Sequence, residues 1–293
     1  MGIEYMDLYN KSKLFINKGI TKRNESDMSE FLLWASLSLE LLGKATLAFI
    51  HPSLVVDPND PKGLLVACGY KNHDDFKTIQ AKTVFERLHV NLSIPKFDHK
   101  KKDFCMSLAN KRNAELHSGL LPFDGLRLDL ILPHFWEICV ILLQFQGKNL
   151  DEWIGSDEAI RALKIITDHS ATLKTIVESR VDACRNNYRE KYKFDQPHII
   201  YDVDDNKELI PCPACNNVAL AYGEFNDKVC EGESEDNPWH AVYTYYYDTT
   251  EVHCRYCDLK LIGYEEVEIV IKDIVFTKTT EEEPDYDYDY GND

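Results

Sequence analysis

The chain has 293 residues, of which 44% are hydrophobic and 28% are charged, and its formal net charge is −17 at pH 7. This length suits two domains better than one, and each half is long enough to bury a core. No apolar run approaches twenty residues and no basic segment is followed by an apolar stretch, so we expect a soluble protein that is neither exported nor inserted in a membrane.

The negative charge is concentrated towards the C-terminus. Residues 195–293 hold 6 of the 33 Lys and Arg and 25 of the 50 Asp and Glu, a net charge of −19, which leaves residues 1–194 at +2. Within this near-neutral part, basic residues gather at Lys100–Lys102, Lys111 and Arg112. Such a run tolerates an anionic partner, although a solvated helix face is its more common origin.

Helical periodicity dominates the first half of the chain. Ser26 or Asp27 is placed to cap one long helix, and His51-Pro52 is placed to end it. Apolar residues that recur every three to four positions predict helices over about 3–18, 27–50, 74–90, 98–116 and 126–145. The last of these is apolar nearly all round, which predicts a buried central helix.

A long, charged helix follows this helical half. The stripe of apolar residues from Ser156 to about Tyr192 predicts one helix that links two halves or pairs with another chain. The same pattern also allows two helices broken near Ser170.

The last third of the chain has the composition of strands. The aromatic run Ala241–Tyr247 and the alternating apolar residues of 267–271 predict strands. The acid-rich stretch Glu224–Pro238 predicts a polar loop. We therefore divide the chain into a helical domain, a long helical linker, a small β domain and a disordered acidic tail, at 1–150, 151–194, 195–276 and 277–293.

The segment Arg-Asn-Ala-Glu-Leu-His, residues 112–117, closes one predicted helix and carries the chemistry of the helical half. Five positions turn a helix by about 500°, so Arg112 and His117 diverge by about 140° unless the helix ends between them. Ser118 and Gly119 follow at once, and Gly just past a helix is a common stop. An Arg that binds phosphate and a His that moves a proton are the minimum groups for RNA cleavage without a metal.

This motif, late in a helix of an all-helical domain, resembles the Arg-Asn-x-x-x-His signature of the HEPN superfamily. The resemblance covers about residues 1–150. It implies a metal-independent endoribonuclease of a bacterial defence or toxin system, which acts as a homodimer with the motif of both chains at one phosphate. It also implies that His117 moves the proton, that Arg112 stabilises charge on the phosphoryl group, and that Asn113 orients the pair.

Structural roles explain the same residues without catalysis. Arg112 can cap the end of its helix, Asn113 can bond to the following loop, and His117 can favour the helix dipole. Glu40 lies four residues before Lys44 on an otherwise apolar helix, which predicts either a helix ion pair or an acid that orients the motif.

Four of the nine cysteines are paired by spacing, as Cys212-Pro-Ala-Cys215 and Cys254-Arg-Tyr-Cys257. Two such turns supply the four sulfur ligands of a closed tetrahedral site, so we predict one structural Zn²⁺ per chain in a zinc ribbon. Exposed dithiols or a redox pair would have the same spacing. Many unpaired thiols without an export signal fit the reducing cytoplasm.

The predicted fold is α+β and multidomain, with an all-α HEPN-like bundle followed by a small β zinc ribbon. The first functional hypothesis is a cytoplasmic, homodimeric endoribonuclease whose substrate is RNA and whose ribbon docks a protein partner or antitoxin. The alternative is a non-catalytic dimeric adaptor whose ribbon recruits a partner. The acidity of the ribbon disfavours direct nucleic-acid binding by that domain.

Overall fold

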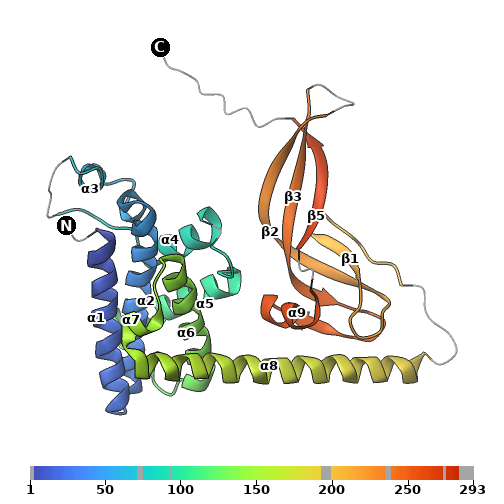
Figure 1. Ribbon diagram of the computed structural model, residues 1–293, viewed down its shortest axis with the longest axis horizontal. Coiled ribbons are helices and arrows are strands. Elements are labelled where there is room, and N and C mark those ends of the chain that lie inside the picture. The colour runs from blue at the N-terminus through green and yellow to red at the C-terminus, as the bar shows by residue number, and fades with distance from the viewer. Residues whose placement is uncertain are drawn as a thin grey trace. The chain divides into compact units, whose positions relative to one another are not determined.

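The computed structural model describes residues 3–70, 75–92, 94–192, 199–234, 239–272 and 275–283, and the chain divides into two compact units (Figure 1). The helical unit is Met1–His169 and the sheet unit is Ser170–Asp293. A helical region followed by an antiparallel sheet with a four-cysteine cluster confirms the predicted α+β, multidomain class.

Four long helices, of 20, 23, 19 and 18 residues, form the main part of the helical unit. Its helices are α1 Tyr5–Asn24, α2 Met28–Ile50, α3 Pro61–Ala67, α4 Ala81–Glu86, α5 His99–His117, α6 Leu128–Phe145 and α7 Leu150–Ile154, with the 3-10 turn η1 Pro52–Val55 and the π-helical turn η2 Arg87–Asn91. The helix predicted over 74–90 begins later than predicted, at Ala81. The short helix α3 lies in a segment for which no helix was predicted. As predicted, Asp27 caps α2, and its carboxylate accepts from the Glu30 N–H at 2.9 Å.

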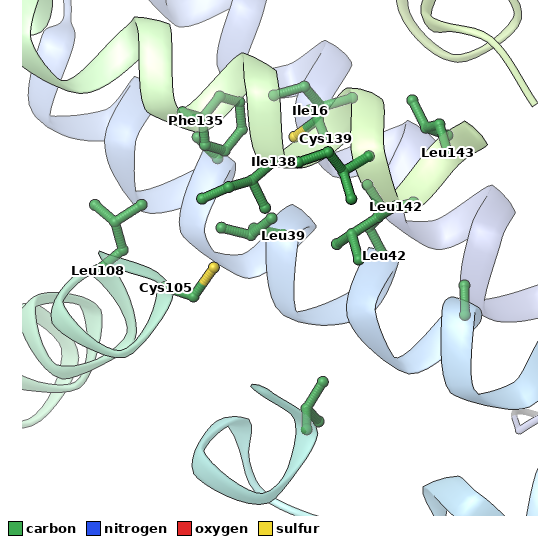
Figure 2. Close-up of a cluster of buried hydrophobic side chains, with 14 of the residues drawn as sticks. Ile16, Leu39, Leu42, Cys105, Leu108, Phe135, Ile138, Cys139, Leu142 and Leu143 are labelled. Atoms are coloured by element: carbon green, nitrogen blue, oxygen red, sulfur yellow. The ribbon is translucent and has the colours of Figure 1, made fainter. Parts of the chain in front are cut away.

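One hydrophobic core joins α1, α2, α5 and α6. Figure 2 shows its centre, where buried side chains of these four helices meet. Gly43 lets α4 approach α2, because a Cβ at that position would lie 2.8 Å from Val84 Cγ1. Close packing of this kind holds α5, and with it the Arg-Asn-Ala-Glu-Leu-His segment, against α2.

The helix α8, Ser156–Lys191, runs unbroken past Ser170 and belongs to both cores. Its first half buries Ala159 and Ala162 in the helical unit, and its second half buries Val177 and Val181 in the sheet unit. The boundary between the two compact units lies between His169 and Ser170, inside the segment 151–194 that was predicted as a long helical linker.

The sheet unit carries one antiparallel sheet in the order β1-β2-β3-β4, with β5 also paired to β3. The elements are β1 Lys207–Pro211, β2 Val218–Glu233, β3 Ala241–His253, β4 Lys260–Ile262, α9 Tyr264–Val270 and β5 Val275–Glu282. Gly223 is required where β2 crosses the stacked rings of Tyr247 and Phe276, since a Cβ there would lie 2.6 Å from the Phe276 ring.

Three predictions for this unit are wrong. Most of the predicted loop Glu224–Pro238 is the second half of β2, while residues 235–238 lie outside the described part of the chain. The alternating apolar residues of 267–271 belong mainly to α9, in which Val267 faces the core. The predicted disordered tail begins inside β5, which pairs with β3 through Glu282, and residues 284–293 are not described.

Only α2 and α6, among the helices described, are long and apolar enough to cross a bilayer. The prediction that no apolar run approaches twenty residues therefore does not hold for these two helices. Both are core helices of the helical unit, with 61% and 44% of their apolar windows buried, and such helices are weak evidence for a membrane protein.

Candidate functional site

The two helices α2 and α5 pack with matching four-residue spacings. Ser36 Oγ donates to the Leu108 carbonyl at 3.2 Å, and one turn later on both helices Glu40 meets Arg112. Glu40 therefore lies one helical turn after Ser36 on α2, and Arg112 lies one helical turn after Leu108 on α5. This register carries the Arg112 side chain into the helical unit, where 9% of it is exposed.

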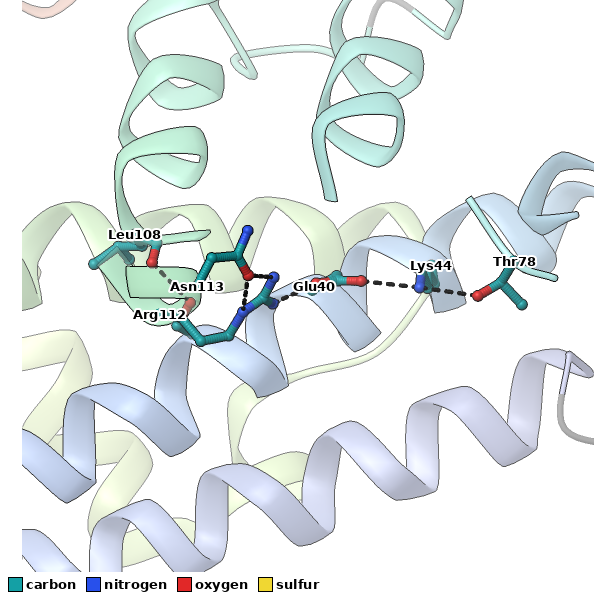
Figure 3. Close-up of polar contacts among 7 residues, drawn as sticks. Glu40, Lys44, Thr78, Leu108, Arg112 and Asn113 are labelled. Atoms are coloured by element: carbon teal, nitrogen blue, oxygen red, sulfur yellow. Dashed lines mark hydrogen bonds and ion pairs between the residues drawn. The ribbon is translucent and has the colours of Figure 1, made fainter. Parts of the chain in front are cut away.

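The Arg112 guanidinium is held from two sides (Figure 3). Nη1 donates to Glu40 Oε2, while Nε and Nη2 both donate to Asn113 Oδ1 at 3.2 and 2.9 Å. These bonds use three of the five guanidinium N–H groups. In the described residues they go to side chains and not to the last carbonyls of α5, so Arg112 does not cap its helix.

The polar chain continues along α2. The Lys44 ammonium lies 2.9 Å from Glu40 Oε1 and donates to Thr78 Oγ1 at 3.2 Å. Glu40 thus makes both of the predicted contacts, one with Lys44 and one with the motif. We call this chain of Asn113, Arg112, Glu40, Lys44 and Thr78 the arginine network.

The arginine network carries one positive charge in excess. Burial raises the pKa of Glu40, but Lys44 and Arg112 lower it further, so this pKa lies below its usual value and the carboxylate stays ionised. Two cations then face one anion, with 9–16% of the three side chains exposed. The network therefore holds one more positive than negative charge, and two guanidinium N–H groups remain beyond the three bonds to Glu40 and Asn113.

His117 is separated from the arginine network within one chain. It is the last residue of α5 and is exposed, and no described residue forms a hydrogen bond or ion pair with its ring. It follows Arg112 by about 7.5 Å along the helix axis and about 140° around it. The structure therefore brings together Arg112, Asn113 and Glu40, but not His117.

Ser118, not Gly119, ends the motif helix. The backbone at Ser118 is extended, and its hydroxyl donates to the Ala114 carbonyl at 2.6 Å. Gly119 has no left-handed backbone, and a Cβ added there would meet nothing within 4 Å. The predicted end is correct, but the expected glycine stop is not used.

The four paired cysteines form a second, compact site in the sheet unit. The Sγ atoms of Cys212 and Cys257 lie 3.6 Å apart, as do those of Cys215 and Cys254, and all four lie within 4.8 Å of one another. Sulfurs bound at about 2.3 Å to a tetrahedral ion are about 3.8 Å apart. The cluster therefore has the size needed to hold one metal ion.

Both Cys-x-x-C turns have the same backbone geometry, and each lies at the tip of a hairpin, between β1 and β2 or between β3 and β4. The Cys212 N–H donates to the Asn217 carbonyl at 2.7 Å, and the Cys254 N–H donates to the Leu259 carbonyl at 2.9 Å. The residue after each second cysteine, Asn216 or Asp258, is left-handed. Asn and Asp tolerate that conformation best among residues with a side chain.

Hydrogen bonds among the cysteine thiols shift the pKa values of Cys212 and Cys257 in opposite directions. The thiols of Cys254 and Cys257 lower the pKa of Cys212 to about 4 through hydrogen bonds, and the Ala214 N–H also donates to this sulfur at 3.4 Å. Hydrogen bonds with Cys212 and Cys254, together with burial, raise the pKa of Cys257. Metal binding requires the deprotonated form of such thiols.

Arg185 ties this site to α8, a role that the sequence did not indicate. Its Nε and Nη2 donate to the carbonyls of Ala214 and Pro213 at 3.1 and 3.2 Å. It thereby anchors the first turn to the second half of α8. A basic residue on a charged helix has no sequence signal for this contact, because the turn lies almost thirty residues away.

No known protein family, curated protein or solved structure matches this chain. The resemblance to HEPN proteins therefore rests on the motif and its helical context.

Proposed function

We propose that the helical unit is a metal-independent endoribonuclease of a cytoplasmic bacterial defence or toxin system. The observation that carries the proposal is the arginine network, a buried cluster with one surplus positive charge on the helix that ends at an exposed histidine. A phosphodiester supplies the missing negative charge, and an exposed imidazole suits proton transfer near neutral pH.

The proposed reaction is transesterification. The ribose 2′-hydroxyl attacks the adjacent phosphate, and His117 accepts or donates the proton that moves. Arg112 stabilises the charge on the phosphoryl oxygens with its unused N–H groups. Asn113 and Glu40 hold the guanidinium in place, so they are positioning residues.

A second copy of the chain is proposed to complete the site. His117 diverges from Arg112 within one chain, and a twofold pair of α5 helices offers the His117 of one copy to the Arg112 of the other. The surroundings favour such a contact, because Leu116, Leu120, Leu121 and Leu130 are 51–71% exposed. Exposed large apolar residues near one motif are typical of an interface.

We also propose that Cys212, Cys215, Cys254 and Cys257 hold one structural Zn²⁺ per chain. A four-sulfur set suits Zn²⁺ and leaves no open position for substrate. When bound, the ion supplies folding free energy to a sheet unit whose core is small.

A non-catalytic adaptor is the second candidate. The burial of Arg112 favours it, since a guanidinium that is 9% exposed and engaged by Glu40 also serves as a structural tie between α2 and α5. RNA cleavage decides between the two candidates.

The test incubates the full-length protein with single-stranded RNA in excess chelator. We expect cleavage that leaves 2′,3′-cyclic phosphate ends, and we expect His117→Ala to lower the rate at least about 100-fold. His51→Ala is the matched control, because His51 is also exposed and lies outside the motif, so its rate should equal that of the wild type. Absent cleavage, dependence on added Mg²⁺, or full activity in His117→Ala would contradict the proposal.

A further inference from the structure

Two edges of the sheet are unpaired along much of their length in the described residues. β1 covers Val218–Tyr222 of β2, and the Gly223 N–H donates to the Asn206 carbonyl at 2.8 Å, so in the described residues the edge of β2 has no strand partner from Glu224 to Glu233. β5 pairs with β3 on one side, and its other side has no strand partner. Unpaired N–H and C=O groups along an edge are a template for another strand.

The open edge of β2 is irregular. Its pairing with β3 shifts register three times, at Tyr222/Gly223, Phe225/Asp227 and Cys230/Gly232. Gly232 also has a φ of 139°, which an ordinary strand does not adopt. Bulges twist and interrupt an edge, and proteins use them to prevent the addition of strands.

The edge of β5 has none of these protections. Its eight residues pair with Ala241–Asp248 of β3 without a register shift, and they include no proline or glycine. Eight residues of strand span about 27 Å. The contrast within one sheet marks β5 as the edge suited to accept another strand.

The charges around this edge select the kind of strand. Lys278 is bound to Glu208 at 2.6 Å, and Lys228 is bound to Glu282 at 3.0 Å, so the lysines near the edge are neutralised within the sheet. Glu281 and Glu283 are exposed and form no ion pair in the described part of the chain. The edge is therefore left with an excess of negative charge.

We propose that the outer edge of β5 binds an extended, basic segment of another protein, which adds a strand to the sheet. Backbone hydrogen bonds along β5 supply affinity, and basic side chains opposite Glu281 and Glu283 supply selectivity. Nucleic acid is repelled by the same charges. A second copy of β5 would bring the same acidic residues to this edge, so it would bind less strongly than a basic segment.

The test uses the full-length protein and the octapeptide Lys-Thr-Lys-Val-Lys-Thr-Lys-Val, labelled with fluorescein at its N-terminus, as the probe. We expect fluorescence anisotropy to show binding, and we expect the peptide with Glu in place of each Lys not to bind. Amide hydrogen exchange should slow at β5 when the basic peptide is added and stay unchanged along Gly223–Glu233 of β2.

Two double variants with the same charge change separate edge binding from general attraction. Glu281→Lys with Glu283→Lys should weaken binding at least about tenfold, since two charges reverse beside the peptide and the net charge there changes by four units. Glu231→Lys with Glu233→Lys, at the bulged edge, should weaken it much less. Equal weakening by both, protection of β2 in place of β5, or β5 already protected by self-association of the free protein would overturn the proposal.

Discussion

The two candidate sites differ in completeness. The four cysteines meet within 4.8 Å in one chain, and two hairpins of the same geometry hold them. The arginine network is also formed within one chain, but His117 lies outside it at the exposed end of α5. The proposed zinc site thus has all four ligands within one chain, whereas the proposed catalytic site needs groups from a second chain.

The largest effect is expected at the cysteine site. Cys212→Ser combined with Cys254→Ser should abolish metal binding and unfold the sheet unit, because structural zinc can supply about 10 kcal/mol to a small domain. Metal analysis and the NMR spectrum of the sheet unit measure both effects. Cys230→Ser, at an exposed position of β2, is the control and should retain the metal. Stoichiometric metal in the double variant would contradict the ligand set.

A smaller loss of stability is expected in the arginine network. Arg112→Ala removes one cation from a carboxylate that is 16% exposed and should lower the free energy of unfolding of the helical unit by about 3 kcal/mol. Arg161→Ala removes a 61% exposed partner of Glu158 and should cost less than about 1 kcal/mol. Urea denaturation compares them, and equal losses would show that burial does not distinguish the two pairs.

The ionised state of Glu40 predicts a pH dependence. Its folded pKa lies below the ordinary value of 4.5, so the stability it contributes is present above that value and is lost as the pH falls through the folded pKa. The difference in free energy of unfolding between the wild type and Glu40→Gln should therefore be constant at neutral pH and shrink in acid. A difference that grows in acid would mean that the folded pKa is raised.

The smallest effect concerns the end of α5. Ser118→Ala removes the bond to the Ala114 carbonyl and should cost about 0.5–1 kcal/mol. Gly119→Ala should be neutral or stabilise by about 0.5 kcal/mol, because its backbone is ordinary and its surroundings are open. Thermal unfolding compares the two variants. A larger loss at Gly119 would assign the helix stop to glycine.

The sequence predicts those features that depend on local patterns. The bounds of α2 follow from its apolar spacing and from Asp27, and the grouping of the four cysteines follows from two fixed Cys-x-x-C spacings. The second half of β2 was missed because its exposed, acidic residues hide the alternation of a strand. The segment of α9 was predicted as a strand because a short apolar run is compatible with either a strand or a helix. α9 has seven residues, of which one is buried.

The contacts of the candidate site depend on tertiary structure. The position of Glu40 on an apolar helix indicated an unusual carboxylate. Its contact with Arg112, however, joins residues 72 positions apart and depends on how α2 packs against α5. Thr78 had no signal, because a threonine before α4 is ordinary. The sequence also did not indicate that the two halves of α8 belong to different hydrophobic cores, since a single apolar stripe runs along the whole helix.

A mixed dimer tests the proposed composite site most directly. Arg112→Gln and His117→Ala chains, each with its own affinity tag, are co-expressed, and the heterodimer is purified through both tags. One Arg112 and one His117 then remain on opposite chains, so the account predicts RNA cleavage in chelator well above that of either variant homodimer. A heterodimer no faster than the two homodimers, or a wild-type monomer that is fully active, would contradict it.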